Sequence, residues 1–319
     1  MPTKPVSLNG KSVIITGGAS GIGLAVVDRL APTGAYITII DKDIATQSNA
    51  SRWTAPGQHV QFIKCDITDW QSQCGAFKEA ARFSPTNKVD TVILVAGITD
   101  GVKGRLVESA LNSEADPMSE LAILPPTTSA IDVNLIGTYY SAWLACRYFR
   151  VNDHDVPPSP FEKSLVFIGS TSAYAGLENS CTSYWASKWG TRGIFQSIKD
   201  DTKRVGARCN LVAPHFVKTK MIDYFEDAPS ALAEMEDVID IIQTCVIDTT
   251  IHGLEYRILT YDGILTWNLA GRSFAVFPRP LKCVDMKDDI EGSYAGPEVS
   301  RIFRLLSQAN ATQGSVVNS

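Results

Sequence analysis

A short apolar run, a glycine-rich turn and a helical pattern follow one another near the start of the sequence, and this succession restricts the chain to few folds. Residues 12–16 read Ser-Val-Ile-Ile-Thr, residues 17–23 read Gly-Gly-Ala-Ser-Gly-Ile-Gly, and residues 24–30 carry apolar side chains at helical spacing. Glycines in such a turn let the backbone approach a pyrophosphate, and the N-terminus of the next helix offers free N–H groups. The order therefore predicts a dinucleotide-binding βαβ unit.

An acidic residue ends the next predicted strand, residues 35–40. Asp41 stands 18 residues after Gly23, close to where a ribose-binding carboxylate is expected. A carboxylate there accepts hydrogen bonds from the ribose hydroxyls and repels a 2′-phosphate, which favours NAD over NADP. Lys42 could weaken this repulsion, so NADP is the less favoured alternative. An ordinary strand-end turn residue is the other interpretation of Asp41.

Tyr184 and Lys188 are four residues apart in a segment that reads as a helix. Side chains at this spacing lie on one helical face, so the ammonium group can stabilise the ionised phenol. A free tyrosine titrates near pH 10 and is a poor acid or base at neutral pH, which a neighbouring cation would improve. Taken alone, the pair is better explained as a packed tyrosine beside a lysine that reaches solvent. The catalytic interpretation of the pair is favoured because a dinucleotide-binding glycine turn is present earlier in the same chain.

Taken together, Thr16-Gly-x-x-x-Gly-Ile-Gly23 and Tyr184-x-x-x-Lys188 resemble the motifs of the short-chain dehydrogenase/reductase family. The resemblance covers residues 8–217 and resumes at residues 271–277. It implies an α/β fold with a doubly wound parallel sheet (Rossmann fold), three α/β/α layers in a single domain, and a nicotinamide cofactor. Within the family, the nearest resemblance is to fungal proteins similar to NAD-dependent 15-hydroxyprostaglandin dehydrogenase.

The resemblance assigns the catalytic roles to four residues. It implies that Tyr184 is the general acid/base, that Lys188 supports it, and that Asn134 holds a water of the proton relay. Ser170, at the end of the predicted strand 164–169, is the expected catalytic serine. It lies one residue further from Tyr184 than is usual in the family, so Thr171 and Ser172 stay open as alternatives.

The residues expected to bind the cofactor come from several strand ends. They are Thr16, Gly17, Ser20, Gly21, Ile22, Gly23, Asp41, Asp66, Ile67, Ala96, Gly97, Tyr184, Lys188, Pro214, Val217 and Thr219. Asp66 could instead cap a helix. Two places depart from the family pattern: Leu94 and Val95 replace two asparagines, and His215 replaces a glycine, whose backbone angles a histidine reaches only at a cost.

Composition limits the classes of protein that fit. The chain has 319 residues, 45% of them hydrophobic, and a net charge of −5, which allows a large core and gives no basic footprint for nucleic acid. No apolar run reaches the roughly 18 residues that span a bilayer, so we expect no membrane partner. Seven cysteines without a C-x-x-C pair read as reduced thiols of a cytoplasmic protein, and the four histidines show no metal-ligand spacing.

We expect a Rossmann-type catalytic domain over residues 1–281 and a partly disordered C-terminal extension over 282–319. A lid is predicted at about 215–235, and the irregular segment 98–126 is expected to rim the substrate site. Residues 254–270 read as an insertion, which is either a flap or oligomer contact, or a gene-model artefact such as a retained intron. The resemblance implies that helices expected near 128–150 and 183–204 form the face of a homodimer or homotetramer, although their apolar residues could equally belong to the core.

The sequence thus predicts an NAD(H)-dependent oxidoreductase that interconverts a secondary alcohol and a ketone. The expected substrate is a medium-sized, apolar or aromatic small molecule, plausibly from fungal secondary metabolism. The alternative is a catalytically weak NAD-binding sensor or scaffold protein. Such a sensor has no use for a polarised phenol, which favours the enzyme.

Overall fold

The computed structural model describes residues 7–43, 52–113, 118, 123–150, 162–173, 180–214, 217–219, 221 and 233–249, and the backbone of four further strands between residues 255 and 286. The chain divides into two compact units, Met1–Val284 and Asp285–Ser319. The predicted boundary after residue 281 stays a prediction. His215, most of the predicted lid and residues 287–319 lie outside the described residues.

Parallel strands form the centre of the first unit. The strands are β1 (Ser12–Thr16), β2 (Tyr36–Asp41), β3 (His59–Lys64), β4 (Thr91–Leu94), β5 (Lys163–Ile168), β6 (Ala207–Pro214) and β9 (Ser273–Val276), and they pair in the order β9-β6-β5-β4-β1-β2-β3. β10 (Cys283–Met286) follows β9 in the strand order. Strands β1, β5 and β6 are buried along their whole length, as expected for parallel strands covered on both faces. The predicted doubly wound sheet is confirmed.

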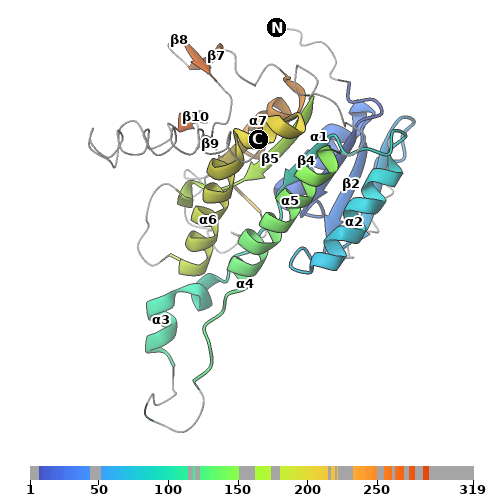
Figure 1. Cartoon of the computed structure of the whole chain (residues 1–319). Coiled ribbons are helices and arrows are strands. Elements are labelled where there is room, and N and C mark those ends of the chain that lie inside the picture. The colour runs from blue at the N-terminus through green and yellow to red at the C-terminus, as the bar shows by residue number, and fades with distance from the viewer. Residues whose placement is uncertain are drawn as a thin grey trace, which may run out of the picture. The chain divides into compact units, whose positions relative to one another are not determined.

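Helices cover both faces of this sheet (Figure 1). On one face α1 (Gly21–Leu30) contacts α7 (Met235–Ile247), and on the other α2 (Trp70–Phe83), α5 (Thr138–Phe149) and α6 (Thr182–Ile198) contact one another in sequence. The shorter helices are η1 (Ala31–Thr33), η3 (Gly101–Gly104), α3 (Leu106–Leu111), α4 (Ser129–Ile131), η4 (Asp132–Gly137), η5 (Thr171–Ala173) and η6 (Asp201–Val205). The molecule therefore has the three predicted α/β/α layers.

Two helices differ from the sequence-based expectation. The helix expected over 128–150 is divided into α4, the π-helix η4 and α5, because a π-turn interrupts it at Asp132–Gly137. The helix expected over 183–204 ends at Ile198 and is followed by the 3₁₀ turn η6. The range 254–270, expected as an insertion, contains an antiparallel hairpin of β7 (Glu255–Thr260) and β8 (Gly263–Asn268), which forms a sheet of its own.

The register of the parallel strands shows where the site lies. Thr16 pairs with Ile40 on one side and with Leu94 on the other, and Leu94 pairs with Phe167. The carboxyl ends of β1, β2, β4 and β5 therefore lie side by side, and the strand order reverses between β1 and β4. Open α/β sheets bind ligands in the crevice at this reversal.

Candidate active site

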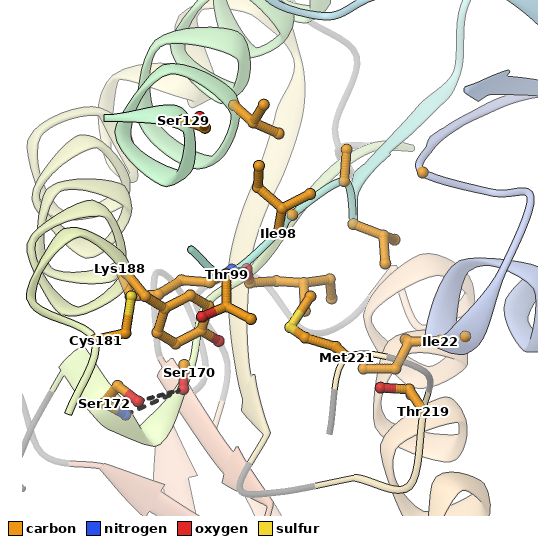
Figure 2. A pocket seen from close by; sticks show the side chains of 18 of the residues that line it. Ile22, Ile98, Thr99, Ser129, Ser170, Ser172, Cys181, Lys188, Thr219 and Met221 are labelled. Atoms are coloured by element: carbon orange, nitrogen blue, oxygen red, sulfur yellow. Dashed lines mark hydrogen bonds between the residues drawn. The ribbon is translucent and has the colours of Figure 1, made fainter. Parts of the chain in front are cut away.

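One cavity of about 1060 Å³ opens at the carboxyl ends of these strands. Fifteen of the sequence-predicted residues line it: Gly17, Ser20, Gly21, Ile22, Asp41, Asp66, Ile67, Ala96, Gly97, Ser170, Tyr184, Lys188, Pro214, Val217 and Thr219. Thr16, Gly23 and Asn134 are not among the residues that line it. In Figure 2, Ile22 and Thr219 lie on one side of the cavity, and Lys188 and Cys181 lie on the other.

The glycine turn packs so closely on neighbouring backbone that it leaves no space for side chains at Gly17 and Gly23. A Cβ atom on Gly17, whose φ is +67°, would lie 2.6 Å from the Cα atom of Ala96. A Cβ atom on Gly23 would lie 2.2 Å from the carbonyl oxygen of Gly17. Gly17, Ser20 and Gly21 of this turn line the cavity, and α1 begins immediately after Ser20. This cradle and the N-terminus of α1 fit a dinucleotide pyrophosphate.

Carboxylates mark the ribose end of the cavity. Asp41 accepts hydrogen bonds from the backbone N–H groups of Ala19, at 3.0 Å, and Asp43, at 3.1 Å. The Lys42 ammonium lies 2.8 Å from an Asp66 carboxylate oxygen. Hydrogen bonds from Lys42 and then from Thr68 hold the pKa of Asp66 at about 2, so this group is ionised at neutral pH. The Lys42 charge is thus directed to Asp66.

Tyr184 and Lys188 both project from α6 into the cavity. Lys188 is only 5% exposed, and its Nζ atom donates a hydrogen bond to the Ile168 carbonyl at 3.0 Å. The same Nζ atom lies 5.7 Å from the centre of the Tyr184 ring. Burial lowers the pKa of Lys188 from 10.5 to about 8, so the amine is mainly protonated at pH 7. A buried cation thus stands beside the phenol.

Asn134 fixes the loop after β4 to α6. Its side-chain oxygen accepts from the Ile98 N–H at 2.8 Å, and its Nδ2 atom donates to the Ile98 carbonyl at 2.9 Å and to the Ser187 hydroxyl at 3.0 Å. The residue is 1% exposed and lies in the π-helix η4. π-Turns are rare and occur frequently at functional sites. The water-holding role implied for Asn134 stays a prediction.

Three hydroxyl residues follow β5 at the cavity wall. Ser170, Thr171 and Ser172 all line the cavity. The Ser170 hydroxyl donates to the Ser172 hydroxyl at 3.0 Å and accepts from the Ser172 N–H at 3.1 Å, as Figure 2 shows. The geometry therefore brings Ser170 and Ser172 together as one hydrogen-bonded pair, and the choice of Ser170 as the catalytic hydroxyl stays a prediction.

Sequence reasoning named the substrate end of the cavity by range alone. Ile98, Thr99, Gly101, Val102 and Arg105 lie in the segment 98–126 expected to rim the site, and Met221 lies in the predicted lid. Ser129, Asp132, Val133, Cys181 and Trp185 also line this end and were not selected. The unusual length of the segment 98–126 was the available signal, and its first part does border the cavity. Most of the added lining is apolar or aromatic, which suits an organic substrate.

Other classes of site have little support in the described part of the chain. No group of three or more His, Cys, Asp or Glu side chains there could hold a metal ion. No helix there is long and apolar enough to cross a membrane. A phenol beside a buried cation, at the end of a dinucleotide cradle, is the arrangement of a nicotinamide-dependent oxidoreductase.

Comparisons with known proteins agree with this geometry. The family model described as short chain dehydrogenase matches residues 11–229, so the chain belongs to the short-chain dehydrogenase/reductase family. It is 36% identical over 314 residues to 5'-hydroxyaverantin dehydrogenase of Dothistroma septosporum, covering 95% of each chain. It is 31% identical over 260 residues to an NADP-dependent dehydrogenase of Cochliobolus lunatus, covering 77% of this chain and 87% of that one.

A solved structure supports the fold. The crystal structure of a dehydrogenase/reductase from Sinorhizobium meliloti superposes with a TM-score of 0.61 at 22% identity, covering 77% of this chain and 91% of that one. The family and the site together define an oxidoreductase that acts on CH–OH groups with a nicotinamide cofactor. One expectation is corrected: the curated relatives at 36% identity are named 5'-hydroxyaverantin dehydrogenases, not prostaglandin dehydrogenases.

Proposed function

We propose that this chain is an NAD(H)-dependent oxidoreductase that interconverts a secondary alcohol and a ketone on a medium-sized, apolar or aromatic secondary metabolite. The observation that carries the proposal is the buried Lys188 ammonium 5.7 Å from the ring of Tyr184, in a cavity that also contains the Ser170 hydroxyl. Two relatives named 5'-hydroxyaverantin dehydrogenases support a substrate of this hydroxylated kind.

The mechanism assigns a separate task to each side chain. In the oxidative direction Tyr184 takes the proton from the substrate hydroxyl, and in the reductive direction it returns that proton. Lys188 favours the phenolate form of Tyr184 through its charge. When substrate binds, the Ser170 hydroxyl turns its proton from Ser172 to the substrate oxygen and holds that oxygen near Tyr184. The nicotinamide ring, when bound, supplies or accepts the hydride.

NAD is the proposed cofactor because of Asp41. Its carboxylate lines the cavity beyond the glycine turn, where it disfavours a 2′-phosphate through like charge. The neighbouring cation, Lys42, pairs with Asp66, so its charge is partly neutralised. The alternative cofactor is NADP, which appears in the names of relatives from Cochliobolus lunatus and a Phoma species.

A cofactor titration followed by an alcohol and ketone panel tests the proposal. We expect NADH to bind at least about 10-fold more tightly than NADPH, followed through nicotinamide fluorescence. Aromatic secondary alcohols should then be oxidised with NAD. Binding without turnover on any alcohol or ketone would instead support the sensor or scaffold alternative, and equal or tighter binding of NADPH would contradict the assignment from Asp41.

We also propose a homodimer or homotetramer that associates through the face formed by η4, α5 and α6. Large side chains are exposed on this face: Ile136, Tyr139 and Trp143 follow one another at helical spacing, and Trp189 lies on α6. Exposed apolar patches of this kind mark interaction surfaces.

The cytoplasmic location stays a prediction.

A further inference from the structure

Arg105 brings to the cavity a positive charge that no other described residue pairs with. Three cationic side chains line the described part of the cavity, namely Lys42, Arg105 and Lys188. Lys42 pairs with Asp66, and Lys188 donates to the Ile168 carbonyl. The Arg105 guanidinium forms no hydrogen bond or ion pair with another described residue. A guanidinium has five N–H donors, so it is suited to an anionic ligand.

Contacts on either side of Arg105 fix its place in the cavity. A Cβ atom on Gly104 would lie 2.4 Å from the Cys181 sulfur and 2.5 Å from the Ser183 hydroxyl oxygen, so the backbone here lies directly against the start of α6. The Leu106 N–H donates to the Thr182 hydroxyl at 3.2 Å. Arg105 is therefore held beside the first turn of α6, which carries Tyr184. It belongs to the substrate end of the cavity.

Two acidic side chains of this region, Asp100 and Asp132, accept hydrogen bonds from other donors. One oxygen of Asp100 accepts from the Ser183 hydroxyl at 2.7 Å and from the Ala130 N–H at 3.0 Å. Asp132, which also lines the cavity, accepts from the Thr128 hydroxyl at 3.1 Å. The remaining side chains at this end include Ile98, Val102 and Trp185. Among the described residues, the lining at this end thus combines apolar and aromatic side chains with a few polar groups and one guanidinium.

We propose that the substrate carries an anionic oxygen group, such as a carboxylate, at a distance from the reacting carbon, and that Arg105 binds this group. The inference rests on the proposed function and names the substrate class more closely: an aromatic or apolar ketone or alcohol with one anionic end. A guanidinium can form two parallel hydrogen bonds to a carboxylate, which lysine cannot reproduce. Arg105 takes no part in the proton transfer assigned to Tyr184, so it is expected to contribute to substrate binding more than to the chemical step.

A matched pair of ketones tests this proposal. The probes are 6-acetyl-2-naphthoate and its methyl ester, which differ in the charge at one end. We expect the wild-type protein to reduce the carboxylate with a KM about 10-fold below that of the ester. Arg105→Gln should raise the KM for the carboxylate by about 10-fold, leaving kcat and the ester KM within about twofold. Arg105→Lys should restore part of the preference.

Lys103→Gln is the matched control, because Lys103 lies on η3, is exposed and does not line the cavity. It removes the same charge two residues away and should leave both KM values unchanged. Equal losses on both ketones in Arg105→Gln would show that Arg105 only shapes the loop and would overturn the proposal. A wild-type protein without preference for the carboxylate would overturn it as well.

A binding measurement separates this inference from the proposed function. Calorimetry with 2-naphthoate and 2-naphthamide measures the charge preference without any turnover. Absence of turnover on every ketone, together with a naphthoate preference that Arg105→Gln removes, would contradict the proposed reaction and support the anion site. Turnover of the neutral ester without any naphthoate preference would support the reaction and overturn the anion site.

Discussion

At the scale of single residues, the site contains charged groups whose ionised forms the fold either destabilises or stabilises. Lys188 is buried and has one hydrogen bond to the Ile168 carbonyl, so its charged form is costly. Asp66 shows the opposite case, because Lys42 and Thr68 stabilise its ionised form and lower its pKa. Strongly perturbed groups that line a cavity are typical of active sites.

Lys188→Met is expected to change how stability depends on pH. Burial lowers the pKa of Lys188 to about 8, so between about pH 8 and 10.5 the unfolded chain holds a proton that the folded chain has lost. Because of this group, the free energy of unfolding of the wild type therefore increases as the pH rises from about 8 to about 10.5. The stability advantage of the methionine variant should fall by about 3 kcal/mol between pH 7 and 10.5. Urea unfolding of both proteins at the two pH values measures this change. A difference in unfolding free energy that is the same at both pH values would contradict the lowered pKa of Lys188.

Asp41→Asn is expected to shift the cofactor preference. The amide has nearly the same shape and can still accept the hydrogen bond from the Ala19 N–H, but it no longer repels a 2′-phosphate. The ratio of the NADPH to the NADH dissociation constant should fall by about 10-fold. Fluorescence titration measures both constants. Lys42→Gln, which changes the neighbouring charge, serves as the comparison. An unchanged ratio of the two dissociation constants in Asp41→Asn would contradict the argument that Asp41 repels a 2′-phosphate.

At the scale of elements, close backbone contacts hold the catalytic helix in place. Gly97 lies beside the Asn134 amide oxygen and the Lys188 ammonium, where a Cβ atom would be 3.3 Å and 3.6 Å away. Gly104 lies against the first turn of α6 in the same way. The loop after β4 therefore packs on η4 and α6 together and connects the elements that carry Asn134, Tyr184 and Lys188.

Gly104→Ala is expected to disturb this packing. Its Cβ atom would overlap the Cys181 sulfur and the Ser183 hydroxyl, so the loop has to move away from α6. We expect a loss of about 1–3 kcal/mol in unfolding free energy and a higher KM for the ketone substrates. Gly75→Ala is the control, since Gly75 is exposed in α2 with open space around it, and helix propensity predicts a gain of about 1 kcal/mol. A Gly104→Ala variant with unchanged unfolding free energy and unchanged KM would contradict the close contact of Gly104 with Cys181 and Ser183.

The elements also show what the sequence could predict. The strands and the glycine turn were predictable, because β-rich runs, glycines and helical spacing are local signals. The π-turn at Asp132–Gly137 was not, since apolar spacing does not distinguish it from an α-helix. The close packing of Gly104 and the proposed role of Arg105 were also missed, because the position of this loop depends on contacts with the start of α6, which lies far away in the sequence.

At the scale of the whole molecule, the layered sheet leaves one helical face with large exposed side chains. Tyr139 is 55% exposed and Trp143 is 51% exposed on α5, and Trp189 is 46% exposed on α6. Burying such rings between two copies would stabilise an assembly by the hydrophobic effect. This face belongs to the layer of α2, α5 and α6, opposite α1 and α7.

Tyr139→Glu is expected to break the proposed assembly into monomers. A charge placed at the centre of a buried apolar interface loses its hydration without gaining a partner. Thr244→Glu is the control, because Thr244 is exposed on α7 in the other helix layer. Sedimentation velocity should show dimers or tetramers for the wild type and the control and monomers for Tyr139→Glu. A monomeric wild type would contradict the assembly.

The most direct test of the account is the turnover of Tyr184→Phe. We predict that turnover of an aromatic ketone with NADH falls by about 10² to 10⁴-fold, while the NADH dissociation constant stays within about twofold. Tyr148→Phe, which removes a phenol that packs near Phe77 outside the cavity lining, should retain full turnover. Near-normal turnover in Tyr184→Phe would contradict the assignment of this phenol as the acid/base group.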